Sequence, residues 1–129
     1  MKRVVIFGAG QAGRMSACWM PAGTELCAYT DNAASLWETE AEGIKIVAPP
    51  QAVALAPDEI WIAVLNREAE PQIRRQLTEM GYEGPVHSIA RLRERMDIRL
   101  AQLRLLAREL TRNGVPGAVA ELGVYQGET

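Results

Sequence analysis

Hydrophobic runs alternate with helix-type spacing over the first 89 residues. Runs rich in β-branched and aromatic residues predict strands at 3–7, 25–30, 44–47, 59–65 and 85–89. Residues 11–19, 51–56 and 68–80 predict the helices between them, and Gly81 ends the last one. Strands that alternate with helices form a parallel sheet with right-handed crossovers. The pattern therefore predicts a doubly wound α/β fold with a parallel five-stranded sheet in the order 3-2-1-4-5.

The pattern then changes to a single long helix, predicted from residue 90 to Asn113 and ended by Gly114. Its apolar residues follow a heptad seam that only Arg99 interrupts: Ile89, Leu92, Met96, Leu103, Leu106 and Leu110. Two interpretations stay open. The helix packs on its own sheet and its arginines form a solvated face, or residues 90–112 form an interdomain helix or a homodimer contact.

A second strand-and-turn signal follows this helix. Residues 118–122 are mostly apolar and run into a glycine turn, which is how a nucleotide-binding α/β domain begins. We therefore expect three parts: a nucleotide-binding domain over 1–89, a linker or dimerisation helix over 90–114, and the first strand and glycine loop of a truncated second domain over 115–129.

Composition and charge narrow the possible functions. A net charge of −2 gives no basic surface for nucleic acid or for an anionic membrane, and no apolar run is long enough for a transmembrane helix. A single histidine and two cysteines without ligand spacing argue against a metal site. The same thiols, in a chain without a signal peptide, predict a reduced, cytoplasmic protein.

A glycine motif stands between the first strand and the first helix. Gly8, Gly10 and Gly13 match G-x-G-x-x-G, and Gln11 opens the helix. In a Rossmann-like fold these glycines permit the tight turn, the approach of a pyrophosphate and the packing of helix on strand. The motif predicts that Gly8, Gly10, Gln11 and Gly13 bind a small-molecule nucleotide. The alternative is a glycine turn kept for packing in a domain that binds nothing.

Two further polar positions follow predicted strands. Asp31 ends the second strand, where an acid accepts a hydrogen bond from a ribose hydroxyl and disfavours a 2′-phosphate; a turn or cap role for Asp31 is the alternative. Asn66 and Arg67 follow the fourth strand and face the same crevice, and we expect Asn66 to contact the nucleotide. Arg67 either meets a phosphate or is a solvated arginine. The sequence has no Tyr-x-x-x-Lys pair and no nucleophile with a base, so we assign no catalytic residue to 1–89.

The first domain resembles small Rossmann domains of carbohydrate and polyketide biosynthesis. The matching segments are 6–10, 29–32, 36–37, 42–47 and Pro50. Such domains stand at the head of nucleotide-sugar dehydratases, sugar acyltransferases and some methyltransferases. The resemblance implies NAD(H) or a nucleotide sugar as ligand.

Residues 115–127 resemble the first S-adenosylmethionine motif of the macrocin O-methyltransferase (TylF) family. Carried over by position, Glu121, Gly123 and Gly127 would contact S-adenosylmethionine in a longer parent protein. The fragment itself would not be catalytic. A flexible glycine-rich tail is the alternative.

Three functional hypotheses follow. The chain is a nucleotide-binding accessory domain of an S-adenosylmethionine-dependent O-methyltransferase acting on a sugar or polyketide-type hydroxyl. Alternatively, it is the NAD-binding domain of a nucleotide-sugar dehydrogenase, epimerase or dehydratase. The third hypothesis is a dimerisation scaffold that binds no ligand.

Overall fold

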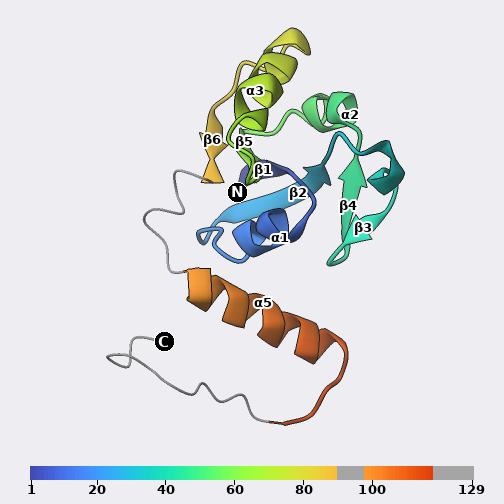
Figure 1. The fold of residues 1–129 in the computed structure, drawn as a ribbon, viewed down its shortest axis with the longest axis vertical. Coiled ribbons are helices and arrows are strands. Elements are labelled where there is room, and N and C mark those ends of the chain that lie inside the picture. Colours follow the sequence, from blue (N-terminus) through green and yellow to red (C-terminus); the bar gives the residue numbers. More distant parts are fainter. Residues whose placement is uncertain (90–97, 118–129) are drawn as a thin grey trace.

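A computed structural model of the protein describes residues 1–89 and 98–117. Its centre is a six-stranded sheet in the order β3-β4-β2-β1-β5-β6 (Figure 1). The strands are β1 (Lys2–Phe7), β2 (Thr24–Thr30), β3 (Glu40–Ala41), β4 (Ile44–Val47), β5 (Glu59–Ile62) and β6 (Val86–Ser88). All neighbouring pairs are parallel except β3 and β4. The predicted Rossmann-like α/β fold is confirmed, and the five predicted strands keep their predicted order.

The sixth strand, β3, is the difference from the predicted sheet. It forms an antiparallel hairpin with β4, in which Ala41 pairs with Ile44. The two turn residues, Glu42 and Gly43, have φ values of 54° and 77°. Positive φ at both positions is typical of the tight hairpin turn that matches the twist of the strands. A two-residue strand with a glutamate in its turn carries no sequence signal strong enough to predict it.

Helices cover both faces of the sheet. α1 (Gln11–Ala17) lies on one face, whereas α2 (Pro49–Ala54) and α3 (Ala69–Glu79) lie on the other. Side chains of β1 alternate between these layers: Val4 and Ile6 face α1, and Val5 and Phe7 face α2 and α3. All four are buried, so β1 is the centre of the core. A short 3₁₀ helix, η1 (Ala34–Leu36), follows β2.

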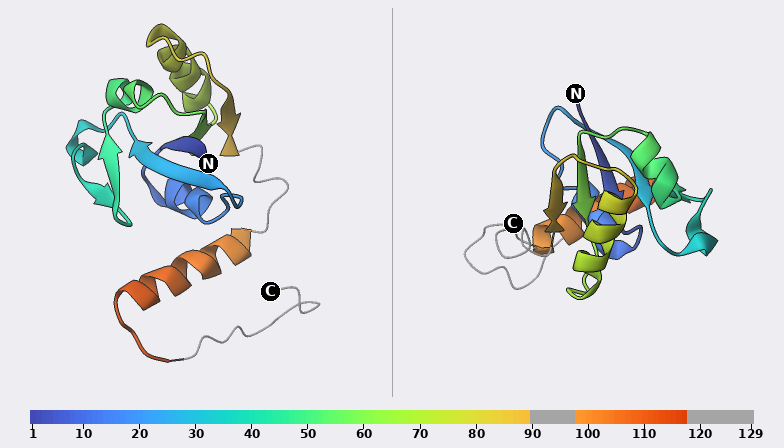
Figure 2. Two further views of the ribbon diagram at one scale, coloured as in Figure 1. Left: turned by 180° about the vertical axis from the view of Figure 1, so that it is seen from behind. Right: turned by 90° about the horizontal axis from the view of Figure 1, so that it is seen from above.

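The last helix, α5 (Ile98–Arg112), packs on α1 (Figure 2). Leu105 is buried against Met15, with Cys18 and Trp19 beside it. The contact that holds α5 within its own chain is therefore with α1. The first eight residues of the predicted helix, 90–97, lie outside the described residues.

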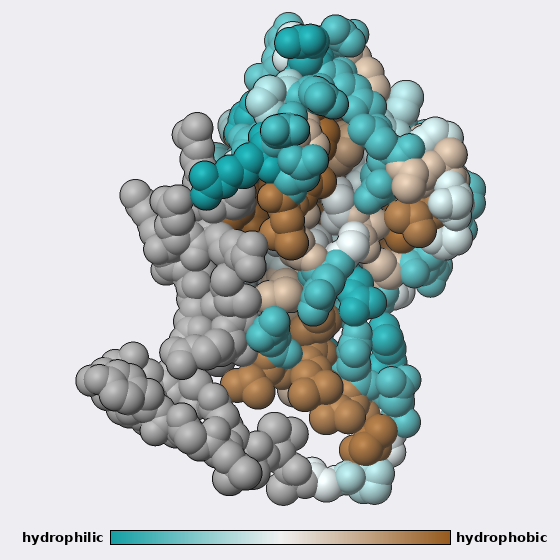
Figure 3. Space-filling model, viewed as in Figure 1, coloured by the Kyte–Doolittle hydropathy of each residue, from teal (hydrophilic) through white to brown (hydrophobic). Residues whose placement is uncertain are grey.

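The contact face of α5 also differs from the predicted seam. The buried leucine of α5 is Leu105, which does not belong to the predicted heptad seam. The seam residue Leu106 is 47% exposed. Figure 3 shows hydrophobic residues gathered along the visible side of α5. The predicted homodimer through 90–112 stays a prediction.

The second predicted glycine loop cannot be placed. Glu121, Gly123 and Gly127 lie in 118–129, outside the described residues. Their proposed contact with S-adenosylmethionine stays a prediction, as does the domain boundary at residue 115.

Candidate functional site

Two glycines of the first motif are required by the fold itself. Gly8 has a φ of 115°, and a Cβ there would lie 2.9 Å from the carbonyl oxygen of Ala63. A Cβ at Gly13 would lie 1.8 Å from the carbonyl oxygen of Gly8. The first glycine therefore permits the turn, and the second lets α1 approach β1 closely, as the motif predicts.

Gly10 is different. Its backbone is extended, with φ −74° and ψ −168°, which any residue can adopt. A Cβ built at Gly10 would have no atom within 4 Å. Nothing in the described protein therefore requires glycine here, and the space above Gly10 is open to a ligand.

The start of α1 adjoins that open space. Gly10 is the N-cap, no side chain caps the helix, and its first turn holds no acid. The first N–H groups of a helix have no intrahelical partner and carry positive potential. Gln11, the first residue of α1, was predicted to take part in binding, and its position beside the open glycine is compatible with that role.

Asp31 lies at the same sheet edge and holds the glycine loop. One carboxylate oxygen accepts the N–H of Ala9 at 3.0 Å, and the other accepts the N–H of Ala33 at 2.9 Å. The indole N–H of Trp37 bonds the Asp31 carbonyl at 2.7 Å. Asp31 is half-buried, and each carboxylate oxygen keeps a second lone pair. The turn role and the ligand role predicted for Asp31 are therefore compatible.

Asn66 has a local role. Its side-chain oxygen accepts the N–H of Glu68 at 2.9 Å, which orders the turn before α3. The side chain is exposed, and its predicted contact with a nucleotide stays untested. Asn32 and Gln76 instead join the loop after β2 to α3 through two amide hydrogen bonds of 3.0 and 2.9 Å.

A small cavity of about 120 Å³ lies beside the glycine loop. Its walls are mainly apolar, from Met15, Trp19, Leu65 and Ile89, and the side chains of Gln11 and Gln102 also line it. Leu65 is 61% exposed because β5 ends at Ile62, three residues earlier than the predicted strand. The sequence did not indicate Leu65 as a site residue, because its position in the predicted strand 59–65 implied that it would be buried in the sheet.

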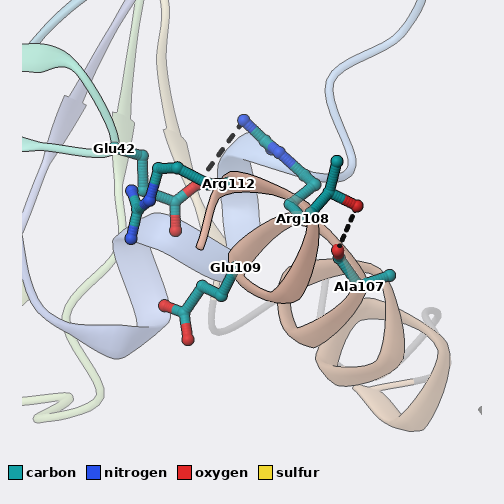
Figure 4. Close-up of a pocket in the computed structure, with 6 residues that line it drawn as sticks. Glu42, Ala107, Arg108, Glu109 and Arg112 are labelled. Carbon is teal, nitrogen blue, oxygen red and sulfur yellow. Dashed lines mark hydrogen bonds and ion pairs between the residues drawn. The ribbon is translucent and has the colours of Figure 1, made fainter. Parts of the chain in front are cut away.

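A cluster of charged side chains joins α5 to α1 and to the β3–β4 turn. The Glu42 side chain is only 7% exposed, and its carboxylate lies 3.4 Å from Arg108 and 4.0 Å from Arg14. Figure 4 shows Arg108 reaching from α5 to Glu42, beside a groove of about 420 Å³. Arg14 also pairs with Glu109 at 3.1 Å.

Tyr29 lies beneath this cluster. Its burial, together with the nearby carboxylate of Glu42, raises the pKa of Tyr29 to about 12. The phenol therefore stays neutral at ordinary pH. Because Glu42 has one arginine partner from α1 and one from α5, the cluster connects the helix that follows the glycine loop to α5.

The domain also has a recognisable sequence family. The profile of the C2185-like family, N-terminal domain, matches residues 1–85. The chain belongs to the C2185-like family. A search of curated protein sequences gives no match. The family domain covers the glycine loop, Asp31 and Asn66, and ends just before β6.

Solved structures share the fold. One is UDP-D-quinovosamine 4-dehydrogenase from Vibrio fischeri, with a TM-score of 0.55 and 18% identity over 75% of this chain and 88% of that one. Another is RSP, a Rex-family repressor, solved with β-NAD⁺ and operator DNA. That complex has a TM-score of 0.54 and 15% identity over 88% of this chain and 60% of the repressor. At these identities the likeness establishes the fold alone.

The described residues include no candidate membrane span and no candidate metal cluster. None of the helices within 1–89 and 98–117 is long and apolar enough to cross a bilayer. In the same ranges, no three histidine, cysteine or acidic side chains are grouped as a metal site would require.

Proposed function

We propose that residues 1–89 bind a nucleotide with a pyrophosphate group, and that NAD(H) is the first candidate. The observation that carries the proposal is the open space at Gly10. Gly8 and Gly13 are explained by the backbone contacts a Cβ would make, but Gly10 is not. A pyrophosphate that approaches the backbone at Gly10 gives a reason for glycine at that position.

The roles of the other residues follow from their geometry. The N–H groups at the start of α1 would bond the pyrophosphate oxygens, and the Gly10 backbone would allow the close approach. Asp31 would accept hydroxyl hydrogen bonds from a ribose and, through its negative charge, disfavour a 2′-phosphate. NAD(H) should therefore bind more tightly than NADP(H).

The solved structures favour NAD(H) over S-adenosylmethionine. RSP, which has a similar fold, was solved with β-NAD⁺ and with β-NADH. The Vibrio fischeri protein is named a UDP-sugar dehydrogenase, which belongs to the class of the NAD-binding hypothesis. Nothing comparable supports the accessory role in an O-methyltransferase, which depends on the sequence resemblances and stays a prediction.

When bound, NAD(H) supplies hydride chemistry. The described residues of this chain would supply binding and orientation: the loop would position the pyrophosphate, and Asp31 would hold the ribose by accepting hydrogen bonds from its hydroxyls.

The test is calorimetric titration of the protein with NADH, NADPH, UDP-N-acetylglucosamine and S-adenosylmethionine. NADH should bind, and Gly10→Val should abolish binding, because the valine side chain occupies the open space. Ala54→Val is the matched control: Ala54 is exposed at the end of α2 and away from the loop. Ala54→Val should unfold close to the wild-type temperature. Gly10→Val should remain folded, with a loss of up to about 1 kcal/mol because valine is a poorer N-cap than glycine.

Three results would contradict the proposal. Normal binding by Gly10→Val would remove the loop from the site. Binding of S-adenosylmethionine alone would favour the methyltransferase hypothesis. A ligand at about 100 times its Kd adds about 2.7 kcal/mol to the free energy of unfolding and so raises the melting temperature. If none of the compounds raises it, the domain is a scaffold that binds none of them.

A further inference from the structure

The two helices that meet at the small cavity lie along each other in a defined register. Gln102 on α5 lines the cavity with Gln11 at the start of α1. Further along α5, Leu105 packs on Met15, and Arg108 donates a hydrogen bond to the Cys18 sulfur at 3.3 Å. The Gln102 end of α5 therefore lies beside the glycine loop.

Several contacts fix α5 in this register. Leu105 is only 6% exposed, Arg14 pairs with Glu109 at 3.1 Å, and Arg108 pairs with Glu42 at 3.4 Å. Residues 102, 105 and 109 recur at helical spacing, so they share the face that α5 presents to α1. Gln102 is thus held at the cavity by neighbours in its own helix.

The cavity has the size of part of a ligand. A volume of about 120 Å³ equals the space of about four water molecules. Whole-ligand pockets are typically about 300 Å³ or more, so this one is too small for a nucleotide. It fits a single ring, for which Leu65 and Trp19 offer apolar surface and the two glutamines offer amide groups.

We propose that α5 forms one wall of the nucleotide site, and that this cavity takes the ring attached beyond the pyrophosphate. The inference rests on the proposed function, because it requires the pyrophosphate at the glycine loop. The ring is the second heterocycle of a dinucleotide or the sugar of a nucleotide sugar. In either case a ligand with this second group contacts α5 through Gln102, whereas a nucleoside diphosphate does not.

The test compares ligands with and without the second group. The affinity for NADH is compared with that for ADP, and the affinity for UDP-N-acetylglucosamine with that for UDP. The two pairs show whether the ring belongs to a dinucleotide or to a nucleotide sugar. In the wild type, the ligand with the second group should bind about tenfold tighter than its partner. Gln102→Trp fills the cavity and should remove that advantage, while the affinity for the diphosphate changes less than about twofold. Leu65→Ala, at an exposed site, should reduce the advantage without affecting the fold.

The control variant is Gln72→Trp, the same substitution at an exposed position of α3. It should leave all affinities unchanged. Hydrogen exchange provides a second readout: NADH or the nucleotide sugar should protect the amides of 102–112, and the diphosphate should not.

The outcomes separate this inference from the proposed function. If the diphosphates bind but Gln102→Trp and Leu65→Ala leave the tenfold advantage intact, the cavity is not the second subsite and the proposed function stands. Equal weakening of both members of a pair also overturns the inference, because Gln102 then acts on the loop. If no nucleotide binds the wild type, both fail.

Discussion

The carboxylate of Asp31 accepts the backbone N–H of Ala9 across the edge of the sheet, at 3.0 Å. The bond joins the residue that follows β2 to the middle of the glycine loop that follows β1. Because the second carboxylate oxygen bonds the N–H of Ala33, one side chain orders both loops at the candidate site. A residue expected to contact a ribose is therefore also part of the framework that positions the glycine loop.

Asp31→Asn tests this double role. The amide keeps one acceptor oxygen but presents an N–H₂ group to one of the two backbone donors, so one bond is lost. We expect a loss of about 1–3 kcal/mol in the free energy of unfolding. The preference for NADH over NADPH should also fall, since the negative charge is removed. Urea denaturation and calorimetry measure the two effects; a stable variant with unchanged preference would show that Asp31 contributes to neither.

Gly13→Ala and Gly10→Ala should differ sharply in stability. The new Cβ at 13 would lie 1.8 Å from the Gly8 carbonyl oxygen, whereas that at 10 meets nothing within 4 Å. We expect a cost of about 1–3 kcal/mol or more for Gly13→Ala, because backbone must shift. Gly10→Ala should cost less than about 1 kcal/mol, as alanine is only a poorer N-cap. Urea denaturation of both variants decides; equal costs would mean that the two glycines have the same structural role.

The sequence predicted the glycine loop better than it predicted the contact face of α5. The G-x-G-x-x-G spacing fixes local backbone geometry, so Gly8 and Gly13 have their expected roles. The face of α5 depends instead on what it meets. Leu105 packs on Met15, a contact between residues 90 positions apart, and nothing in the spacing of leucines indicates it. The heptad pattern selected Leu106, which stays 47% exposed.

Glu42 is a charged residue whose partners could not be predicted from the sequence either. As one of eleven acids in residues 25–83, it has no distinguishing pattern. Its side chain becomes 93% buried only because the β3–β4 turn and α5 meet there, leaving 7% exposed. The cavity lined by Leu65 and Gln102 could not be predicted from the sequence for the same reason, because its walls come from separate parts of the chain.

Glu42→Gln should loosen α5. The substitution keeps the shape of the buried Glu42 side chain but removes the charge that faces Arg14 and Arg108. We expect a loss of about 1–3 kcal/mol, with faster hydrogen exchange in α5 than in β1. Glu38→Gln, at an exposed position, is the control. Wild-type exchange rates in α5 of the Glu42 variant would show that the charge of Glu42 does not hold the helix.

Acid should weaken the contact between the start of β1 and β5. The hydrogen bond from Lys2, at 2.6 Å, holds the pKa of Glu59 below its ordinary value of 4.5. A carboxyl whose pKa is lower in the folded state stabilises the protein above the unfolded pKa, and that contribution disappears as pH falls through the folded value. Glu59→Gln should therefore be less stable than wild type at pH 7, and the gap should close below about pH 4. A gap that stays constant across melting curves from pH 7 to 3 would contradict this pairing.

The homodimer predicted through residues 90–112 can be tested at Leu106. Because Leu105 packs on α1 in the same chain, the surface left for a second copy centres on the exposed Leu106, with Leu103 and Leu110 half-buried beside it. We expect Leu106→Glu to convert a dimer to a monomer in sedimentation equilibrium and to leave α5 on α1, since Leu105 is untouched. Thr111→Glu places the same charge at an exposed position outside the seam and should keep the dimer. If Leu106→Glu has the wild-type mass, α5 is not the interface, and its leucines serve only the contact with α1.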